Sequence, residues 1–152
     1  MDIGEFKHAL KPCGALIGFD FGVKRLGVAV SDLSRMIATS YTIIERKSFA
    51  KDIVAIEKII ADKEVCGLVY GLPKQMDGSE GEVAILTRQF ASRVDEKVHL
   101  PYTFWDERLS SKAVENFLIS GVDLSRQKRK KVLDSSAAAY ILQGFLDALQ
   151  RF

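Results

Sequence analysis

Apolar and polar positions along the first part of the chain predict three consecutive strands. Residues 16–21 are apolar on both faces, as in a central strand that helices cover on both sides. Val28 and Val30 continue the pattern on a returning strand, and residues 36–44 form a third, rich in β-branched side chains. Because short turns separate these runs, we expect antiparallel hairpins.

The apolar spacing then changes from that of a strand to that of a helix. Four isoleucines between residues 51 and 63 recur at helical intervals with charges between them, which predicts an amphipathic helix. Residues 65–72 form another strand that is apolar on both faces, and Pro73 ends it. The order strand, helix, strand predicts a right-handed parallel crossover.

The second half of the chain continues this alternation. A loop over residues 71–81 leads into a helix for which Ser79 and Glu82 have capping-box spacing. The further elements are a strand over residues 98–105, a short helix capped by Ser110, and a last helix that starts near Asp134. Together they predict an α/β fold: a mixed five-stranded sheet, an antiparallel meander plus parallel strands, flanked by helices on both faces.

Length and composition favour a single domain. The chain has 152 residues, of which 47% are hydrophobic and 28% charged, as in an ordinary globular protein. Residues 1–14 show no clear periodicity, and we expect a peripheral N-terminal arm there, followed by one domain over residues 15–152. The net charge of +2 gives no global field toward a polyanion, so a nucleic-acid partner must be argued from local clusters.

The sequence also bears on location and redox chemistry. Cys13 and Cys66 are far apart and form no CxxC motif, which supports neither a disulfide scaffold nor a zinc site. The N-terminus lacks the apolar core of a signal peptide, and no run is long enough to span a membrane. We expect a cytoplasmic protein with no membrane partner.

Three aspartates stand where predicted strands or helices begin or end. Asp20 interrupts the apolar first strand, Asp106 follows a later strand, and Asp134 opens the last helix. Each has a simpler interpretation alone: Asp20 bonding turn amides, Asp106 solvated at a strand end, and Asp134 capping a helix. Ligand sites of open α/β sheets form at the carboxyl ends of strands, so Asp20 and Asp106 would meet there if their strands run parallel.

Positive charges flank these carboxylates. Lys24 and Arg25 lie in the turn after Asp20, and Arg108 follows Asp106. A basic connector covers residues 126–131 and includes Lys128, Arg129, Lys130 and Lys131. Such a cluster is either a solvated loop or a contact for a nucleic-acid backbone.

Four stretches together resemble the YqgF/RuvX family, whose members are ribonuclease H-like. They are residues 18–32 (GFDFGVKRLGVAVSD), 69–79 (VYGLPKQMDGS), 106–110 (DERLS), and 134–138 (DSSAA) running into 141–147 (ILQGFLD). They follow in the family's order and cover nearly the whole chain from residue 15. Residues 1–14 lie outside the match.

The resemblance implies a ribonuclease H-like sheet and a divalent-metal site whose acidic positions fall on Asp20, Asp106 and Asp134. Mg²⁺ or Mn²⁺ suits this set, because such ions take oxygen ligands and a few carboxylates suffice. Glu107 is the next candidate. It ranks below Asp106 because adjacent residues of a strand point to opposite sides.

The resemblance favours a metal-dependent endonuclease of structured nucleic acid that processes the 5′ end of pre-16S rRNA, with the ribosomal particle as a possible partner. A Holliday junction resolvase is the alternative, and it would need a dimer to place two sites on one junction. A non-catalytic nucleic-acid-binding regulator is a third. The sequence leaves open whether the protein is a monomer or a homodimer.

Overall fold

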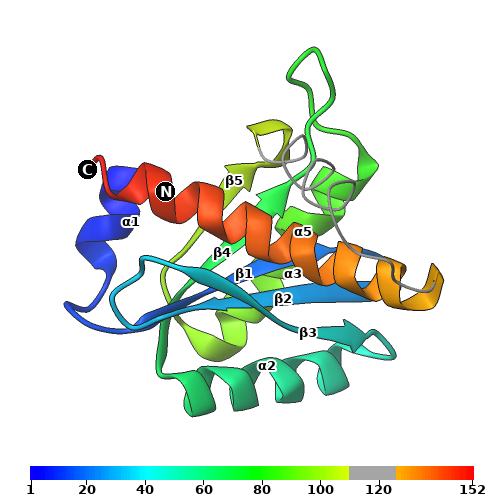
Figure 1. Ribbon diagram of the computed structural model, residues 1–152, viewed down its shortest axis with the longest axis horizontal. Helices are drawn as coiled ribbons and strands as arrows, with labels where there is room; N and C mark the ends of the chain where they lie inside the picture. The colour runs from blue at the N-terminus through cyan, green and yellow to red at the C-terminus, as the bar shows by residue number, and fades with distance from the viewer. Residues whose placement is uncertain (110–125) are drawn as a thin grey trace.

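The computed structural model describes residues 1–109 and 126–152, with side chains for residues 1–108 and 137–152. Within these residues the chain forms a five-stranded sheet in the order β3-β2-β1-β4-β5 (Figure 1). The strands are β1 (Ala15–Phe21), β2 (Arg25–Ser31), β3 (Ala38–Glu45), β4 (Val65–Leu72) and β5 (Tyr102–Asp106).

Strand directions place three carboxyl ends at one edge of the sheet. β1 pairs with β2, and β2 with β3, in antiparallel fashion, whereas β1–β4 and β4–β5 are parallel. The predicted mixed sheet is therefore confirmed. β1, β4 and β5 all end at the same edge, which is where Asp20 and Asp106 lie.

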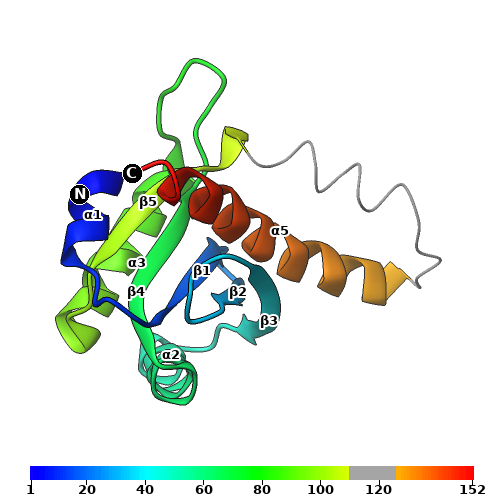
Figure 2. The same cartoon turned by 60° about the vertical axis from the view of Figure 1, so that its left-hand side comes forward.

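Helices cover both faces of this sheet. They are α1 (Ile3–Ala9), α2 (Phe49–Lys63), α3 (Glu82–Val98) and α5 (Arg126–Leu149), with a 3₁₀ turn η1 (Glu107–Leu109) after β5. α2 and α3 pack on the face that carries Ile17 and Phe19. α5 packs on the opposite face, which carries Leu16 and Ala29, and Figure 2 shows it running along that side of the sheet.

The N-terminal arm is more ordered than the sequence suggested. Instead of a peripheral segment the structure has helix α1, which Asp2 caps by accepting a 2.8 Å hydrogen bond from the Glu5 backbone. Phe6 is fully buried and meets Phe145 of α5 edge to face at 5.5 Å between ring centroids. A helix of seven residues offers only two turns of apolar spacing, too few for a clear periodic signal.

Two element boundaries differ from the expected ones. α3 continues to Val98 and ends where His99 adopts a left-handed conformation (φ 51°), so β5 starts only after Pro101, at Tyr102. The capping box expected at Ser79 does not form. Gly81 is the N-cap of α3 and gives no side-chain bond, whereas Ser79 bonds to Asp77 within the preceding loop.

The last helix begins eight residues before the predicted start. α5 starts at Arg126, so the basic segment forms its first turns rather than a connector, and Asp134 lies inside the helix instead of opening it. Glutamine, lysine and arginine favour helices, which explains why a charged run continues one. The short helix expected after Ser110 lies outside the described residues.

Candidate active site

Asp20 is the one residue of β1 that is not buried. It lies on the face that α5 covers, because Gly18, two residues earlier, sits directly against α5. A Cβ on Gly18 would lie 2.6 Å from the Cβ of Leu142. The central strand of the sheet therefore carries a half-buried carboxylate near its end, on the same face as α5.

The strand register shows which residues accompany Asp20. Phe19 is the partner of Tyr70, so the next step along the two parallel strands brings Asp20 beside Gly71. Gly71 is in turn the partner of Trp105. Because paired residues of neighbouring strands point to the same face, Trp105 shares a face with Asp20, and Asp106 points to the opposite face.

Glu107 reaches back toward Asp20 through a space that Gly71 leaves open. A Cβ on Gly71 would lie 2.5 Å from Cδ1 of Ile141 in α5, and 2.7 Å from Oε1 and 3.1 Å from Cγ of Glu107. Any side chain at this position would therefore displace both the glutamate and the end of Ile141. The glycine near the end of β4 makes room for a carboxylate that comes from η1, directly after the neighbouring strand β5.

Glu107 has an unusual electrostatic environment. Burial, the negative charge of Asp20 and a hydrogen bond with Asp20 raise the pKa of the Glu107 carboxyl to about 7, and Asp106 adds a smaller effect. Two carboxylates that share one site disfavour each other's ionised form. A cation between them would relieve this repulsion, as it does in metal-dependent active sites.

The carboxylate of Asp106 is instead paired with the guanidinium of Arg108. Arg108 donates from Nε to both carboxylate oxygens at 3.1 and 3.0 Å, and from Nη2 at 2.7 Å. These bonds from Arg108 lower the pKa of Asp106 below its usual value. The structure thus joins Asp20 with Glu107 and leaves Asp106 paired with Arg108, so a role for Asp106 in metal binding stays a prediction.

Asp134 and the basic segment lie in the first turns of α5. The side chains of Asp134, Lys128, Arg129, Lys130 and Lys131 fall outside the described residues, so their predicted roles remain predictions. Asp134 precedes Ala138 by four residues, and Ala138 is buried against the sheet. Among the described side chains, no group of three His, Cys, Asp or Glu residues is placed to hold a metal ion.

The turn between β1 and β2 carries the other two predicted cations. Arg25 pairs with Glu45 of β3 across the strand pair, with 3.5 Å between Nε and Oε1, and both side chains are well exposed. The Lys24 carbonyl accepts a 2.9 Å hydrogen bond from the Arg46 backbone. The turn that follows Asp20 is therefore held against the end of β3.

Arg46 is a residue of this region that the sequence analysis missed. Its Nη1 donates to the carbonyls of Gly22 and Val23 at 3.2 and 3.4 Å, and its Nε donates to the buried Asp52 at 3.0 Å. The guanidinium also lies 4.8 Å from the ring centroid of Phe21. These contacts of Arg46 with the turn and with Asp52 form what we call the Arg46 clamp. Asp52 could have revealed it from the sequence, because this acidic residue occupies an apolar position of α2, four residues before Ile56.

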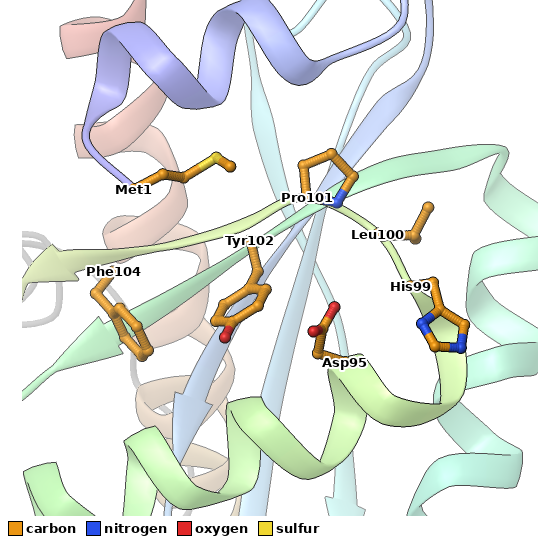
Figure 3. A pocket seen from close by; sticks show the side chains of 7 residues that line it. All are labelled: Met1, Asp95, His99, Leu100, Pro101, Tyr102 and Phe104. Atoms are coloured by element: carbon orange, nitrogen blue, oxygen red, sulfur yellow. The ribbon is translucent and has the colours of Figure 1, made fainter.

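A separate cavity lies away from these carboxylates (Figure 3). It measures about 460 Å³ and is lined by Met1, Asp95, His99, Leu100, Pro101, Tyr102 and Phe104. Apart from Met1, these residues come from the end of α3, the start of β5 and the connection between them, whereas Asp106 ends β5. The cavity is therefore no part of the acidic site.

Solved structures share this architecture. RuvC of *T. thermophilus*, in complex with a Holliday junction substrate, matches 90% of this chain and 96% of its own with a TM-score of 0.57 at 10% sequence identity. The fowlpox virus resolvase, in complex with Holliday junction DNA, matches 89% of this chain and 98% of its own with a TM-score of 0.54 at 10% identity. At these identities the likeness establishes the fold, which is that of the RuvC-like, ribonuclease H-like resolvases.

Sequence comparison gives the family. A family profile described as "RuvX: Holliday junction resolvase" matches residues 14–148, and the chain belongs to this family. A protein of *Paracoccus denitrificans* named "Putative pre-16S rRNA nuclease" is 49% identical over 149 residues, covering 98% of this chain and 94% of the relative. A *Bradyrhizobium* protein of the same name is 52% identical over 136 residues, covering 90% and 84%.

The resemblance drawn from the four sequence stretches is thus confirmed. The chain is a hydrolase of a nuclease family that acts on nucleic acid. No helix among the described residues is long and apolar enough to cross a bilayer.

Proposed function

We propose that this protein is a metal-dependent endonuclease that processes the 5′ end of pre-16S rRNA. The observation that carries the proposal is the pair of carboxylates, Asp20 and Glu107, held together at the carboxyl edge of the sheet. The names of the full-length relatives support the substrate. A cytoplasmic location, expected from the sequence, goes with that substrate.

Asp20 and Glu107 would hold Mg²⁺ or Mn²⁺, and Asp134 is the proposed third ligand from α5. The donor set fits, because carboxylate oxygens suit hard divalent ions and because burial and the charge of Asp20, which raise the pKa of Glu107, both disfavour an ionised carboxylate that a cation would stabilise. When bound, such an ion supplies an activated water and stabilises the leaving oxygen of a phosphodiester. Asp106 would act on this site through Arg108, or as a ligand if Arg108 releases it.

The basic residues would hold the nucleic-acid backbone. Lys24 and Arg25 follow Asp20 in the chain, and Arg108 follows Glu107. Lys128, Arg129, Lys130 and Lys131 precede Asp134 in α5. Replacing the last four with serine should weaken RNA binding at all sequences alike and make the salt dependence shallower, by up to about one unit of slope per lost contact.

The distribution of charge favours a short stretch of RNA over four junction arms. The chain has a net charge of +2 and one compact basic segment, whereas the many phosphates of a junction would favour a broader positive surface. Selectivity would then come from RNA shape or from a bound ribosomal particle.

A side-by-side cleavage assay tests this proposal. Purified protein with Mn²⁺ is given a precursor RNA fragment that spans the mature 5′ end, and a synthetic mobile four-way junction. We expect cleavage of the RNA, loss of that cleavage in Asp20→Asn, and unchanged cleavage in Asp62→Asn, which alters an exposed carboxylate of α2. Full activity of Asp20→Asn, or activity in excess chelator, would contradict the metal site.

A Holliday junction resolvase is the second candidate, because the family description and the two resolvase structures name junctions. It requires two active sites on one junction and hence a homodimer, whereas an RNA-processing enzyme could act as a monomer. Symmetric nicking of the junction with the RNA left intact would select the resolvase.

A further inference from the structure

The loop between β4 and α3, residues 73–81, projects from the body of the molecule (Figures 1 and 2). The side chain of Met76, near its tip, is fully exposed. The backbone N–H of Gly78 donates to the carbonyl of Gln75 at 2.8 Å, which closes a tight turn with Met76 at its second position. Gly78 has a φ of 87°, a conformation that favours glycine.

The loop is braced from within. The N–H of Gln75 donates to the carbonyl of Ser79 at 2.9 Å, and Lys74 and Glu80 form an antiparallel bridge below it. The Ser79 hydroxyl donates to Asp77 at 2.6 Å. A loop with this many internal bonds holds its shape, so Met76 is presented to solvent rather than folded onto the protein surface.

Arg108 ties the loop to the proposed active site. Its Nη1 donates to the Gln75 carbonyl at 3.4 Å, while the rest of the guanidinium grips Asp106. Glu107, the partner of Asp20, is the residue between them in the chain. The position of Met76 is thereby linked, through one side chain, to the edge of the sheet that carries the paired carboxylates.

The acidic side chains of the loop are occupied by partners within the protein. Asp77 accepts two bonds from Ser79, and its pKa is lowered by them, with a smaller contribution from the charge of Arg108. Glu80 pairs with Arg88 of α3 at 2.5 Å between Oε1 and Nε. The tip therefore presents an apolar side chain beside Asp77, whose carboxylate is hydrogen-bonded within the loop, and above Glu80, which is paired with Arg88.

We propose that Met76 is a wedge that inserts at a base step next to the scissile phosphate and unstacks the end of an RNA helix. Met76 is fully exposed and held outward by a braced loop, and apolar side chains such as methionine open base steps in other nucleic-acid-binding proteins. The inference rests on the proposed nuclease function and adds the residue that recognises the helix end.

Fluorescence of a base analogue tests the wedge without cleavage. The probe is an RNA hairpin with an unpaired 5′ extension and 2-aminopurine as the first paired base, which brightens when unstacked. Full-length Asp20→Asn protein should bind it with a fluorescence increase. Adding Met76→Ala should remove most of the increase yet leave affinity for a plain duplex within about twofold, because phosphate contacts carry that binding.

Matched variants separate the wedge from a change in folding. Met76→Leu should keep the fluorescence increase, and Val54→Ala, at an exposed apolar position of α2, should not affect it. In the active protein, Met76→Ala should slow cleavage of the paired hairpin about tenfold and leave a hairpin already mismatched at that step unaffected.

The outcomes distinguish the two proposals. Equal fluorescence with and without Met76→Ala in the Asp20→Asn protein, together with equal cleavage by wild type and Met76→Ala, would overturn the wedge and leave the nuclease function standing. Equal slowing on paired and mismatched hairpins would also overturn it, since the loop would then act on something other than base unstacking. No binding of RNA by any variant would overturn both.

Discussion

Asp106 and Glu107 are adjacent in the chain, yet the structure gives them opposite surroundings. Asp106 meets the guanidinium of Arg108 and has a lowered pKa. Glu107 meets burial and the charge of Asp20, and its pKa rises to about 7. One carboxylate is stabilised as an anion by a neighbouring guanidinium, whereas burial and a neighbouring carboxylate disfavour the ionised form of the other.

This difference arises from the geometry of β5 and its neighbours. Adjacent residues at a strand end point to opposite faces, and the register places Asp20 on the face that Trp105 and then Glu107 share. The two carboxylates of this acidic dipeptide therefore face different surroundings.

The largest expected effect is on catalysis. Glu107→Gln should lower the cleavage rate by more than about a thousandfold, because it removes half of the carboxylate pair, whereas Asp106→Asn should cost only about tenfold, as for groups that act through a neighbour. Single-turnover cleavage of the precursor RNA fragment with saturating Mn²⁺ measures both. The reverse order would restore Asp106 to the metal site and relegate Glu107.

The next largest effect is expected from filling the space beside Gly71, which should lower both activity and stability. Gly71→Ala should displace Glu107 from Asp20 and lower activity by about ten- to a hundredfold, with a stability loss of about 1–3 kcal/mol from overpacking. Gly67→Ala, on the same strand, is the control, because its Cβ would meet Leu10 and Phe6 in the core instead. If Gly67→Ala loses as much activity as Gly71→Ala, general destabilisation explains both.

The sequence made the sheet predictable but not this division of the carboxylates. Two-sided apolar runs at residues 16–21 and 65–72 identified the central strands, and their parallel pairing placed the acidic edge. Assigning Glu107 rather than Asp106 to the site of Asp20 needed the register between β1, β4 and β5, which are separated by about 30 or more positions in the chain. Nothing local in the sequence encodes that register. Once the structure is known, Gly71 can be explained by it, because this glycine leaves the space that Glu107 occupies beside Asp20.

Long-range contacts also explain the other differences between the predictions from the sequence and the structure. Phe6 gains its burial from Phe145, at the far end of the chain, so the arm's own pattern could not show that it belongs to the core. The Arg46 clamp joins a strand end, a turn and a helix, and only the out-of-place Asp52 hints at it. The roles of Asp134 and the four basic residues of α5 still rest on the sequence.

The raised pKa of Glu107 has a consequence for stability in metal-free protein. Its folded pKa lies above the usual 4.5, so the folded state binds a proton more tightly than the unfolded state, and stability is lost as the pH rises from about 4.5 through about 7. Glu107→Gln should therefore match wild type near pH 4 and exceed it at pH 8 by about 1–2 kcal/mol. Urea unfolding in chelator at the two pH values measures this, and a pH-independent difference would show that neither burial nor Asp20 raises the pKa of Glu107 in the folded protein.

The smallest expected effect is on stability at Asp106, where the pH dependence has the opposite sign to that at Glu107. Its folded pKa is lowered by Arg108, so its contribution to stability is present above the unfolded pKa and is lost as the pH falls through the folded value. Asp106→Asn should therefore be less stable than wild type at neutral pH and equal to it in strong acid. Because the Arg108 side chain is 42% exposed, solvent screens the pair, and the loss should stay below about 1 kcal/mol. The same urea series, run on both variants, should thus give curves of opposite sign for two neighbouring residues, and curves of the same sign would mean that the two carboxylates share one environment.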